Sequence, residues 1–342
     1  MSPEGLYDAA CKCFKGTDWK RSVAAFELNA WERCIKLSDE LRAGTYRPRP
    51  PKRFEITRPK RRPCLSVGIR DRVYQRSLCD NVVYPAMTKS LIPANCACQK
   101  GKGTDYAIER LKKMLRRHWH HHGTQGYVLQ MDIAGYYPNM RHDVVIEAFA
   151  SKLDAESYSH VEAILARQYA GNIGFDPGSQ LVQIAGTSAL DGLDHHIKER
   201  LRVKGYIRYM DDMLCIGETK EGLERIRDDI AAYLAKLGWE LHPSKTHIQR
   251  IDRRIPWLGF TFELLQTGFI SVRCKPDKIR DDRRRFRRIA QTAARGGISP
   301  EKADEIAYTS IRRLQRNCSN RADPEKLETY WKQMKGEICS AR

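Results

Sequence analysis

The sequence predicts an α+β fold, in which helices accompany an antiparallel sheet. Strand-like and helix-like segments alternate through residues 127–272. Inside this region, two short apolar runs are separated only by a pair of aspartates and their neighbour, a pattern typical of a β-hairpin. The segments before and after this region have helical patterns and many basic residues. We therefore expect a central sheet with helical parts towards both ends of the chain.

The first 126 residues are expected to be mainly helical. Residues 1–50 have a mixed helical pattern that ends in a stiff, proline-rich stretch at 47–51. The expected packing anchors of this segment are aromatic, namely Trp19, Phe26 and Trp31. Residues 52–126 are basic, with helical patterns over Asp71–Met87 and Tyr106–Arg117.

Residues 127–272 supply the predicted sheet. The expected elements are, in order, a strand over 127–132, helices over 141–152, from 155 and over 183–202, the aspartate hairpin, a helix over 220–237, a strand over 239–242 and strands around 257–272. Residues 275–342 are expected to be helical and basic, with breaks at Gly296-Gly297 and near Asp323-Pro324.

Two aspartates mark the predicted hairpin. Its strands cover 206–209 and 213–216, and Asp211 and Asp212 are expected in the turn between them. Adjacent carboxylates repel each other, so presenting both at one tip is favourable mainly when a cation neutralises them. The alternative is a polar turn without a function, because aspartate is a common turn residue.

A second acidic segment favours the functional interpretation. Residues 127–138 have the pattern of an apolar strand that ends at Asp132, followed by a tight turn and two aromatic residues. Asp132 at a strand end and Asp211 at a hairpin tip can converge on two Mg²⁺ ions, with Mn²⁺ as the alternative. Two such ions, about 3.5–4 Å apart, form the clamp of nucleotidyl transfer, in which one ion activates a primer 3′-hydroxyl and the other holds the triphosphate.

On these two segments the chain resembles the reverse transcriptases of bacteria. Residues 127–138 resemble the first palm motif of that family, and Tyr209 to Asp212 resemble its catalytic hairpin. Further similar motifs follow in the family's order within residues 25–290: two basic fingers motifs, a lysine-bearing segment and a primer-grip hairpin, at 59–75, 98–104, 243–245 and 257–260. The resemblance implies a right-hand polymerase fold with an N-terminal helical segment (1–50), fingers (51–126), a palm (127–272) and a short helical thumb (273–342).

One motif departs from the common pattern of the family, which is Pro-Gln-Gly followed by Ser-Pro. Here Gly178 matches the glycine, Pro177 stands where the glutamine usually is, and Gln183 stands where the proline usually is. The reverse transcriptases of diversity-generating retroelements have Ser-Gln at the last pair, which Gln183 matches and Val182 does not. The departure concerns nucleotide selection, fidelity and lineage, because it leaves the acidic residues unchanged.

The resemblance also implies roles for single residues. Asp132, Asp211 and Asp212 are implied to be catalytic and to bind the metal ions together with the backbone carbonyl of Ile133, and Lys245 to protonate the leaving pyrophosphate. The residues implied to contact the incoming nucleotide are Lys60, Arg62, Arg70, Tyr137, Gly178 and Gln183. The resemblance implies that Tyr137 is the steric gate, whose ring clashes with a ribose 2′-hydroxyl. Arg72 is an alternative candidate for contact with the triphosphate.

The charge of the chain indicates a polyanionic partner. The formal net charge is +19, and release of counterions from a nucleic acid would favour its binding. The alternative is a basic protein with no such partner. The residues expected to contact nucleic acid are Lys100, Lys102, Trp257, Gly259, Arg280, Arg283, Arg284 and Arg287. The four arginines belong to a run in one expected helix, for which a solvated face is the alternative.

The sequence shows no feature of a membrane or secreted protein. It has no apolar run of about 18 residues and no basic segment followed by an apolar one at its start, so a cytoplasmic location is expected. The eleven cysteines are scattered and are expected to be reduced thiols rather than zinc ligands. The histidine-rich run 118–122 is expected to be an exposed helix end, where cationic histidine suits the helix dipole.

The expected activity is RNA-directed DNA synthesis on a dedicated noncoding RNA. The expected partners are the RNA template and primer, the RNA–DNA duplex and deoxynucleotides; association with a partner protein or a second copy of the chain is left open. The unusual segment 177–183 favours a role in bacterial antiphage defence, with a retron or a diversity-generating retroelement as alternatives. Two further classes are a template-independent or RNA-making polymerase, against which Tyr137 argues, and an inert RNA-binding module, against which the retained acids argue.

Overall fold

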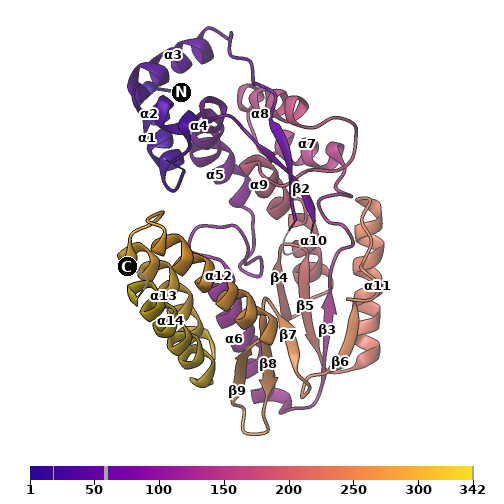
Figure 1. The fold of residues 1–342 in the computed structure, drawn as a ribbon. Helices are drawn as coiled ribbons and strands as arrows, with labels where there is room; N and C mark the ends of the chain where they lie inside the picture. Colours follow the sequence, from indigo (N-terminus) through magenta and orange to yellow (C-terminus); the bar gives the residue numbers. More distant parts are fainter. Residues whose placement is uncertain (18, 58–60, 341–342) are drawn as a thin grey trace. The chain divides into compact units, whose positions relative to one another are not determined.

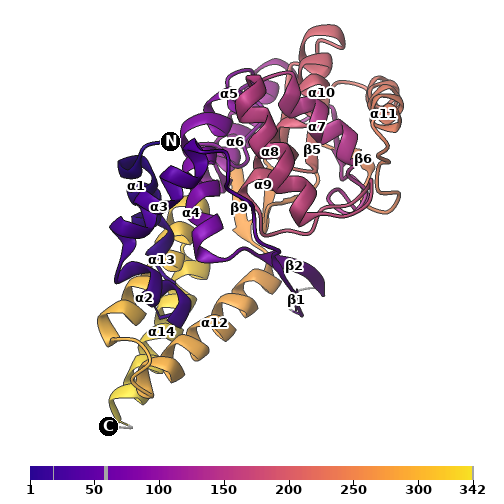
Figure 2. The ribbon, with the colours of Figure 1, turned by 90° about the horizontal axis from the view of Figure 1, so that it is seen from above.

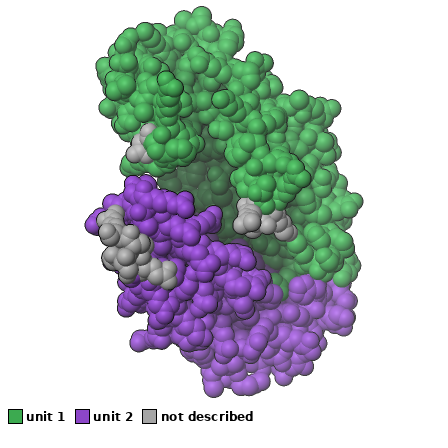
Figure 3. All heavy atoms as spheres, viewed as in Figure 1, with its two compact units in different colours: residues 1–100, 130–213, 226–246 green, residues 101–129, 214–225, 247–342 purple. Residues whose placement is uncertain are grey.

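The computed structural model describes residues 1–342 except residues 18, 58–60 and 341–342. The chain forms two compact units, which Figure 3 distinguishes by colour. The first comprises residues 1–100, 130–213 and 226–246, and the second comprises residues 101–129, 214–225 and 247–342. Helices and antiparallel sheets occur together, which confirms the predicted α+β class. No helix in the described part of the chain is long and apolar enough to cross a membrane.

The first unit begins with three helices, namely α1 (Pro3–Phe14), α2 (Arg21–Glu27) and α3 (Ala30–Arg42) (Figure 1). Of the three predicted anchors, Phe26 is buried, which confirms one prediction. The prediction was wrong for Trp19 and Trp31, which are 77% and 47% exposed. Aliphatic residues such as Leu37 fill the space between the helices, so Trp31 instead packs edge-on against Tyr7 at the surface, with ring centroids 5.6 Å apart.

A hairpin and a long interrupted helix follow. The hairpin was not predicted, and its antiparallel strands are β1 (Lys52–Ile56) and β2 (Arg62–Ser66). The helix expected over 71–87 consists of α4 (Ile69–Leu78), a π-helical turn (Cys79–Val83) and α5 (Tyr84–Thr88). Pro85 accounts for the wider turn, because its ring clashes with the preceding turn of a regular α-helix and it has no N–H to donate.

The helices of the central region agree with the prediction except for one. The elements are α7 (His142–Ala150), α8 (Ala155–Gln168), α9 (Gln180–Ser188), α10 (Asp191–His195) and a π-helical turn (His196–Arg200). A single helix over 183–202 was therefore wrong, because the chain breaks after Ser188. The hydroxyls of Thr187 and Ser188 donate to the carbonyls of Gln183 and Ile184, which is the back-bonding that bends and weakens helices.

The central sheet has the order β4-β5-β3-β6. Its strands are β3 (Tyr127–Met131), β4 (Gly205–Tyr209), β5 (Asp212–Gly217) and the unpredicted β6 (His247–Arg250), and α11 (Lys220–Lys236) lies between β5 and β6 in sequence, as predicted. The strand expected over 239–242 was wrong: only Leu241 pairs, in an isolated bridge to Ile133. Pro243 follows directly and has no N–H with which to extend a ladder.

The second unit contains a three-stranded antiparallel sheet in the predicted region. Its strands are β7 (Ile255–Trp257), β8 (Phe260–Leu264) and β9 (Ile270–Cys274). Leu258 and Gly259 form the two-residue turn between β7 and β8, with φ of +48° and +83°. Positive φ at both central residues matches the twist of the strands on either side.

The helix α6 (Thr104–His122) of the second unit is longer than predicted. It includes the histidine run, of which His118 is buried and bonds through Nε2 to the carbonyl of Gln125 at 2.5 Å. Burial lowers the pKa of His118, so the expectation of an exposed cationic residue was wrong at this position. His120, His121 and His122 are exposed, as predicted.

The C-terminal helices α12 (Pro276–Ala294), α13 (Pro300–Asn317) and α14 (Ala322–Ser340) lie side by side (Figures 1 and 2). Phe286 of α12 packs edge-on against Trp331 of α14, with ring centroids 5.5 Å apart. The indole N–H of Trp331 donates to Asp304 of α13 at 2.8 Å. These contacts join the three helices into one bundle, and the helical prediction for this region is confirmed.

Candidate active site

Asp132 follows the last residue of β3 at a point where another loop crosses the end of the strand. The N–H of His242 donates to the carbonyl of Asp132 at 2.7 Å, and the N–H of Ala134 donates to the carbonyl of Glu240 at 2.9 Å. These bonds flank the isolated bridge described above. The backbone on both sides of Asp132 is therefore held, and its side chain is buried.

The aspartate hairpin differs in one detail from the prediction. Its turn consists of Met210 and Asp211, whereas Asp212 is already the first residue of β5. Met210 has a φ of +56°, the left-handed conformation that a tight hairpin turn requires at its first central residue. The two adjacent carboxylates therefore start from different backbone positions, one in the turn and one in the strand.

The charged groups around Asp211 shift its pKa and that of Lys245. Burial, followed by the negative charge of Asp132, raises the pKa of the Asp211 carboxyl. Lys245 donates from Nζ to Oδ1 of Asp132 at 2.8 Å, and this bond raises the pKa of its ammonium group. Asp211 and Asp212 act on Lys245 in the same direction. Half-exposed Lys245 and Arg62 act in the opposite direction on Asp211 and lower its pKa, but burial has the largest effect.

A cavity of about 600 Å³ opens over these carboxylates within the first unit. The predicted site residues that line it are Arg62, Asp132, Ile133, Tyr137, Asp211 and Lys245. His242, Arg53 and Arg61 also line it and were not predicted. Arg53 belongs to β1, a five-residue exposed strand in which only Phe54 and Ile56 are apolar, and this pattern was too short to predict a strand. Arg61 lies in the fingers motif at 59–75 but was not singled out as a site residue.

Tyr137 forms part of the wall of this cavity. Its ring lies against Gly186 of α9, where an added Cβ would come within 2.9 Å of the tyrosine oxygen. Burial raises the pKa of its hydroxyl, which stays protonated. The neighbouring Tyr136 is buried, and its hydroxyl donates to the carbonyl of Gly186 at 2.5 Å. Tyr136 therefore packs inside, and Tyr137 lines the open space.

Gly178 brings the loop before α9 into contact with the β1–β2 hairpin. An added Cβ would lie 2.1 Å from the carbonyl oxygen of Leu65, and the φ of Gly178 is +132°. The N–H of Leu65 donates to the carbonyl of Pro177 at 3.0 Å, and Arg53 forms an ion pair with Asp176. Only glycine fits this approach of two backbones, so Gly178 holds one wall of the cavity in place.

Among the described residues predicted to bind the nucleotide, Arg70, Gly178 and Gln183 do not line this cavity. Arg70 lines a different cavity and pairs with Glu40 and Asp71, at 2.9 Å from the latter. Gln183 is exposed on α9 and donates to Sγ of Cys98 at 3.3 Å. Lys60 lies outside the described residues.

The predicted nucleic-acid contacts outside α12 are two lysines near tyrosine rings, a buried tryptophan and a turn glycine. Lys100 places its ammonium 5.2 Å from the ring centroid of Tyr84, and that of Lys102 lies 5.9 Å from the ring centroid of Tyr106. Trp257 is only 3% exposed, so its ring belongs to the core of the second unit. Gly259 forms the turn beside it. A tryptophan in a short apolar strand is a packing residue here, which local sequence could not reveal.

Helix α12 presents the arginine run on its exposed sides. A buried stripe that includes Asp282, Phe286 and Ala290 faces the bundle, while the four predicted arginines are exposed. Arg280 pairs with Asp277, and Arg284 pairs with Asp281 at 3.4 Å. Part of the mutual repulsion is therefore relieved by aspartates on the same helix, which the prediction had not considered.

Replacement of Arg283, Arg284 and Arg287 with glutamine is expected to weaken binding to all RNA–DNA duplexes alike. A dense array of cations contacts phosphates rather than bases, so the slope of log K against log salt should flatten by roughly one unit per lost contact. Titrations of two unrelated duplexes at several salt concentrations measure this.

The matched control removes three cations from α11, by Lys220→Gln, Arg227→Gln and Lys236→Gln, and should leave the slope unchanged. A slope as steep as wild type in the α12 variant would identify the run as a solvated face. Weaker binding to one duplex only would show that the run reads structure or sequence.

The donor set of the site fits a divalent metal of the magnesium type. Among the residues that the structure describes, no three histidine, cysteine, aspartate or glutamate side chains converge into a complete metal cage. Magnesium in nucleotide-processing sites is held by one or two carboxylates and by the phosphates of the substrate, so a closed cage is not needed. Asp132 and Asp211 provide such oxygens on the cavity wall, which Ile133 also lines.

Comparison with known proteins adds two observations. A solved structure of apo telomerase from Candida tropicalis, truncated from its C-terminal domain, is similar to this chain with a TM-score of 0.48 and 13% sequence identity. The similarity covers 66% of this chain and 55% of the telomerase chain, so the present chain spans little more than half of that protein. No curated protein sequence matches the chain.

The chain also matches a model of a protein family. Residues 58–262, more than half of the 342 residues, match the family described as reverse transcriptase (RNA-dependent DNA polymerase). This range contains both acidic segments, the β1–β2 hairpin from Arg62 onward and Lys245. The match confirms the predicted reverse transcriptase family and enzyme class, whereas the bacterial lineage stays a prediction. The chain belongs to the reverse transcriptase family of RNA-dependent DNA polymerases.

Proposed function

We propose that this chain extends a primer with deoxynucleotides opposite an RNA template, by nucleotidyl transfer centred on Asp132 and Asp211. The observation that carries the proposal is that Asp132 and Asp211, from distant parts of the chain, both line a cavity of about 600 Å³, where burial and Asp132 raise the pKa of Asp211. A carboxylate in this position is stabilised when a cation binds beside it.

The acidic residues have a defined task in this reaction. Two bound divalent ions would activate the primer 3′-hydroxyl and stabilise the charge on the leaving pyrophosphate. Asp132 and Asp211 would hold them, with the carbonyl of Ile133 as a further oxygen ligand. Asp212, at the start of β5, would contribute its charge to the same region, because it already acts on Lys245.

Lys245 is proposed to protonate the leaving pyrophosphate. Its Nζ is bound to Asp132 at 2.8 Å, and that bond raises its pKa, so the ammonium form predominates at neutral pH. A protonated lysine beside the reacting phosphates can donate a proton to pyrophosphate as it leaves. Its half-exposed side chain remains accessible to substrate.

The arginines on the hairpin side of the cavity would bind the triphosphate. Arg62 lines the cavity, and its charge is felt at Asp211, whose pKa it lowers against the larger effects of burial and Asp132. Positive groups aimed at the transferring phosphates stabilise the charge that develops there. Lys60 is proposed for the same role on the basis of its motif.

The proposal is tested by primer extension on an RNA template, on a DNA template of the same sequence and without a template, each with deoxynucleotides or ribonucleotides. We expect RNA-templated extension with deoxynucleotides. Extension without a template, or with ribonucleotides in preference, would assign the chain to the alternative polymerase class. No product under any condition, with duplex binding retained, would identify an inert binding module.

The biological template is proposed to be a dedicated noncoding RNA in a bacterial antiphage defence system. The support is the unusual segment 177–183, which departs from the common family motif. A retron or a diversity-generating retroelement is the alternative role. Sequencing of the RNA and DNA that copurify with the protein would distinguish these roles, because one abundant RNA and its complementary DNA are expected in the first case.

A further inference from the structure

Arg208 is the second-to-last residue of β4, and its side chain is completely buried together with that of Asp194 on α10. The guanidinium contacts the carboxylate at two points: Nε donates to Oδ1 at 2.7 Å and Nη2 donates to Oδ2 at 2.5 Å. The hydroxyl of Tyr206 also donates to Oδ1 of Asp194, at 2.7 Å. This pairing meets the requirement that a buried charge be both paired and hydrogen-bonded.

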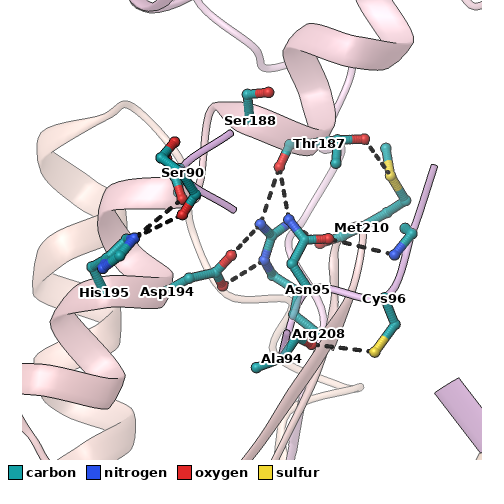
Figure 4. A network of polar contacts seen from close by, with 12 residues as sticks. Ser90, Ala94, Asn95, Cys96, Thr187, Ser188, Asp194, His195, Arg208 and Met210 are labelled. Atoms are coloured by element: carbon teal, nitrogen blue, oxygen red, sulfur yellow. Dashed lines mark hydrogen bonds and ion pairs between the residues drawn. The ribbon is translucent and has the colours of Figure 1, made fainter. Parts of the chain in front are cut away.

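The guanidinium has donors left after this pairing, and they reach two backbone carbonyls. Nη2 donates to the carbonyl of Thr187 at 3.1 Å, and Nη1 donates to the carbonyl of Met210 at 3.0 Å. Figure 4 shows the guanidinium between the carboxylate of Asp194 and the carbonyl of Thr187. Asn95 donates to the same carbonyl of Thr187, at 3.1 Å.

The backbone from which this side chain starts is itself held. The N–H of Arg208 donates to the carbonyl of Ala94, and the N–H of Cys96 donates to the carbonyl of Arg208, both at 2.9 Å. The segment 94–96 thus pairs with β4 beside Arg208, as Figure 4 shows. With its backbone and its carboxylate partner both in place, the guanidinium has little freedom to move.

The carbonyl of Met210 belongs to the peptide that joins Met210 to Asp211. The orientation of this peptide decides where the backbone of Asp211 lies, and hence where its carboxylate points. Met210 has a φ of +56°, which a side chain with a Cβ adopts only where its surroundings hold it. Arg208 is one of these surroundings, and Thr187, whose hydroxyl oxygen lies 3.5 Å from Sδ of Met210, is another.

We propose that Arg208 is a positioning residue for the active site. Anchored on Asp194, it holds the Met210–Asp211 peptide so that the carboxylate of Asp211 is presented to the catalytic cavity beside Asp132. The inference rests on the proposed polymerase function. It also explains why the apolar strand that leads into the catalytic turn carries a charged residue.

The alternative is that the ion pair only stabilises the fold, and Arg208→Lys separates the two roles. Lysine keeps a positive charge for Asp194, but a single ammonium group cannot span Asp194, Thr187 and Met210 as the planar guanidinium does. We expect a folded protein whose kcat falls about 10- to 100-fold, because a small displacement of a reacting group costs this much. The KM for deoxynucleotides and the Kd for duplex should stay unchanged, since neither depends on Asp211 alone.

Tyr206→Phe is the matched control. It removes the hydroxyl that donates to Asp194 but leaves the bond from Arg208 to Met210 intact. We expect a lower melting temperature with an unchanged kcat. The double variant Arg208→Met with Asp194→Leu removes both buried charges, which is often neutral for stability. We expect it to have a melting temperature close to that of the wild type but a kcat below that of the wild type. Wild-type kcat in the double variant or in Arg208→Lys would overturn the proposal.

Hydrogen exchange of a peptide that covers residues 209–212 tests the inference without polymerase activity. Exchange there should be faster in Arg208→Lys than in Tyr206→Phe, because only the lysine variant releases the turn. If the wild-type protein extends no primer, the proposed function fails, yet this measurement still reports on the turn. Unchanged exchange in Arg208→Lys would contradict the inference itself.

Discussion

Replacing Asp211 and Asp212 together with asparagine is expected to lower the rate of primer extension by about a thousandfold or more. Asparagine preserves the volume of both side chains but removes the charges that would hold the metal ions. RNA binding should remain nearly unchanged, because the basic surface is untouched. Primer extension and filter binding on the same preparation measure both quantities.

The same substitution is not expected to destabilise the fold. The pKa of Asp211 is raised by burial and by Asp132, so ionisation of this group costs stability, and the cost is fully present at pH values above the raised pKa. Asparagine has no such cost. The melting temperature at neutral pH should therefore equal or exceed that of the wild type, and lost extension in a stable variant assigns the defect to the chemistry.

A matched control for this variant exists on α11. Asp228 and Asp229 are also adjacent and are exposed; Asp228 pairs with Arg227, and Asp229 pairs with His196 at 2.6 Å. Replacing both with asparagine changes the net charge equally and should leave extension at the wild-type rate. Wild-type rates in the Asp211 and Asp212 variant would refute the catalytic assignment.

Tyr137→Ala is expected to raise the incorporation of ribonucleotides relative to deoxynucleotides by about 10- to 100-fold. The ring lines the cavity and leans on Gly186, so its removal leaves open volume. A ribose 2′-hydroxyl that clashes with the ring would then fit. Single-nucleotide extension with each sugar, at matched concentrations, measures the ratio of kcat/KM values.

Tyr137→Phe is the control for this prediction. It keeps the ring and removes only the hydroxyl, so a gate that works by volume should keep its selectivity for deoxynucleotides. An unchanged ratio in a folded Tyr137→Ala protein would return Tyr137 to a packing role. A loss of selectivity in both variants would show that the hydroxyl, rather than the ring, excludes ribose.

The features that the sequence alone determined are those that neighbours along the chain control. An apolar strand that ends at Asp132 and a hairpin that carries Asp211 are patterns of a few consecutive residues, and both were placed correctly. The family followed from these two segments and their order. Helices α11 and α12 were likewise predictable, because helical periodicity over many residues is a strong local signal.

Several positions of side chains depend on contacts between distant segments, which local pattern does not reveal. Trp257, in the segment that resembles a primer grip, is buried, because burial depends on which elements pack over a strand. Arg70 lies in a motif of the family, and its guanidinium forms an ion pair with Glu40 of the earlier helix α3. Strand β1 is exposed and has only two alternating apolar residues, Phe54 and Ile56, so its pattern was too short to predict a strand.

The geometry of the site was decided only by the tertiary structure. The sequence named Asp132 and Asp211, which are 79 positions apart by their numbers, but it could not tell what holds either in place. The loop 240–242 holds the backbone of Asp132, and Arg208, paired with Asp194, holds the peptide before Asp211. These restraints come from parts of the chain that meet only on folding, because buried charges and backbone groups must find their partners wherever the fold provides them.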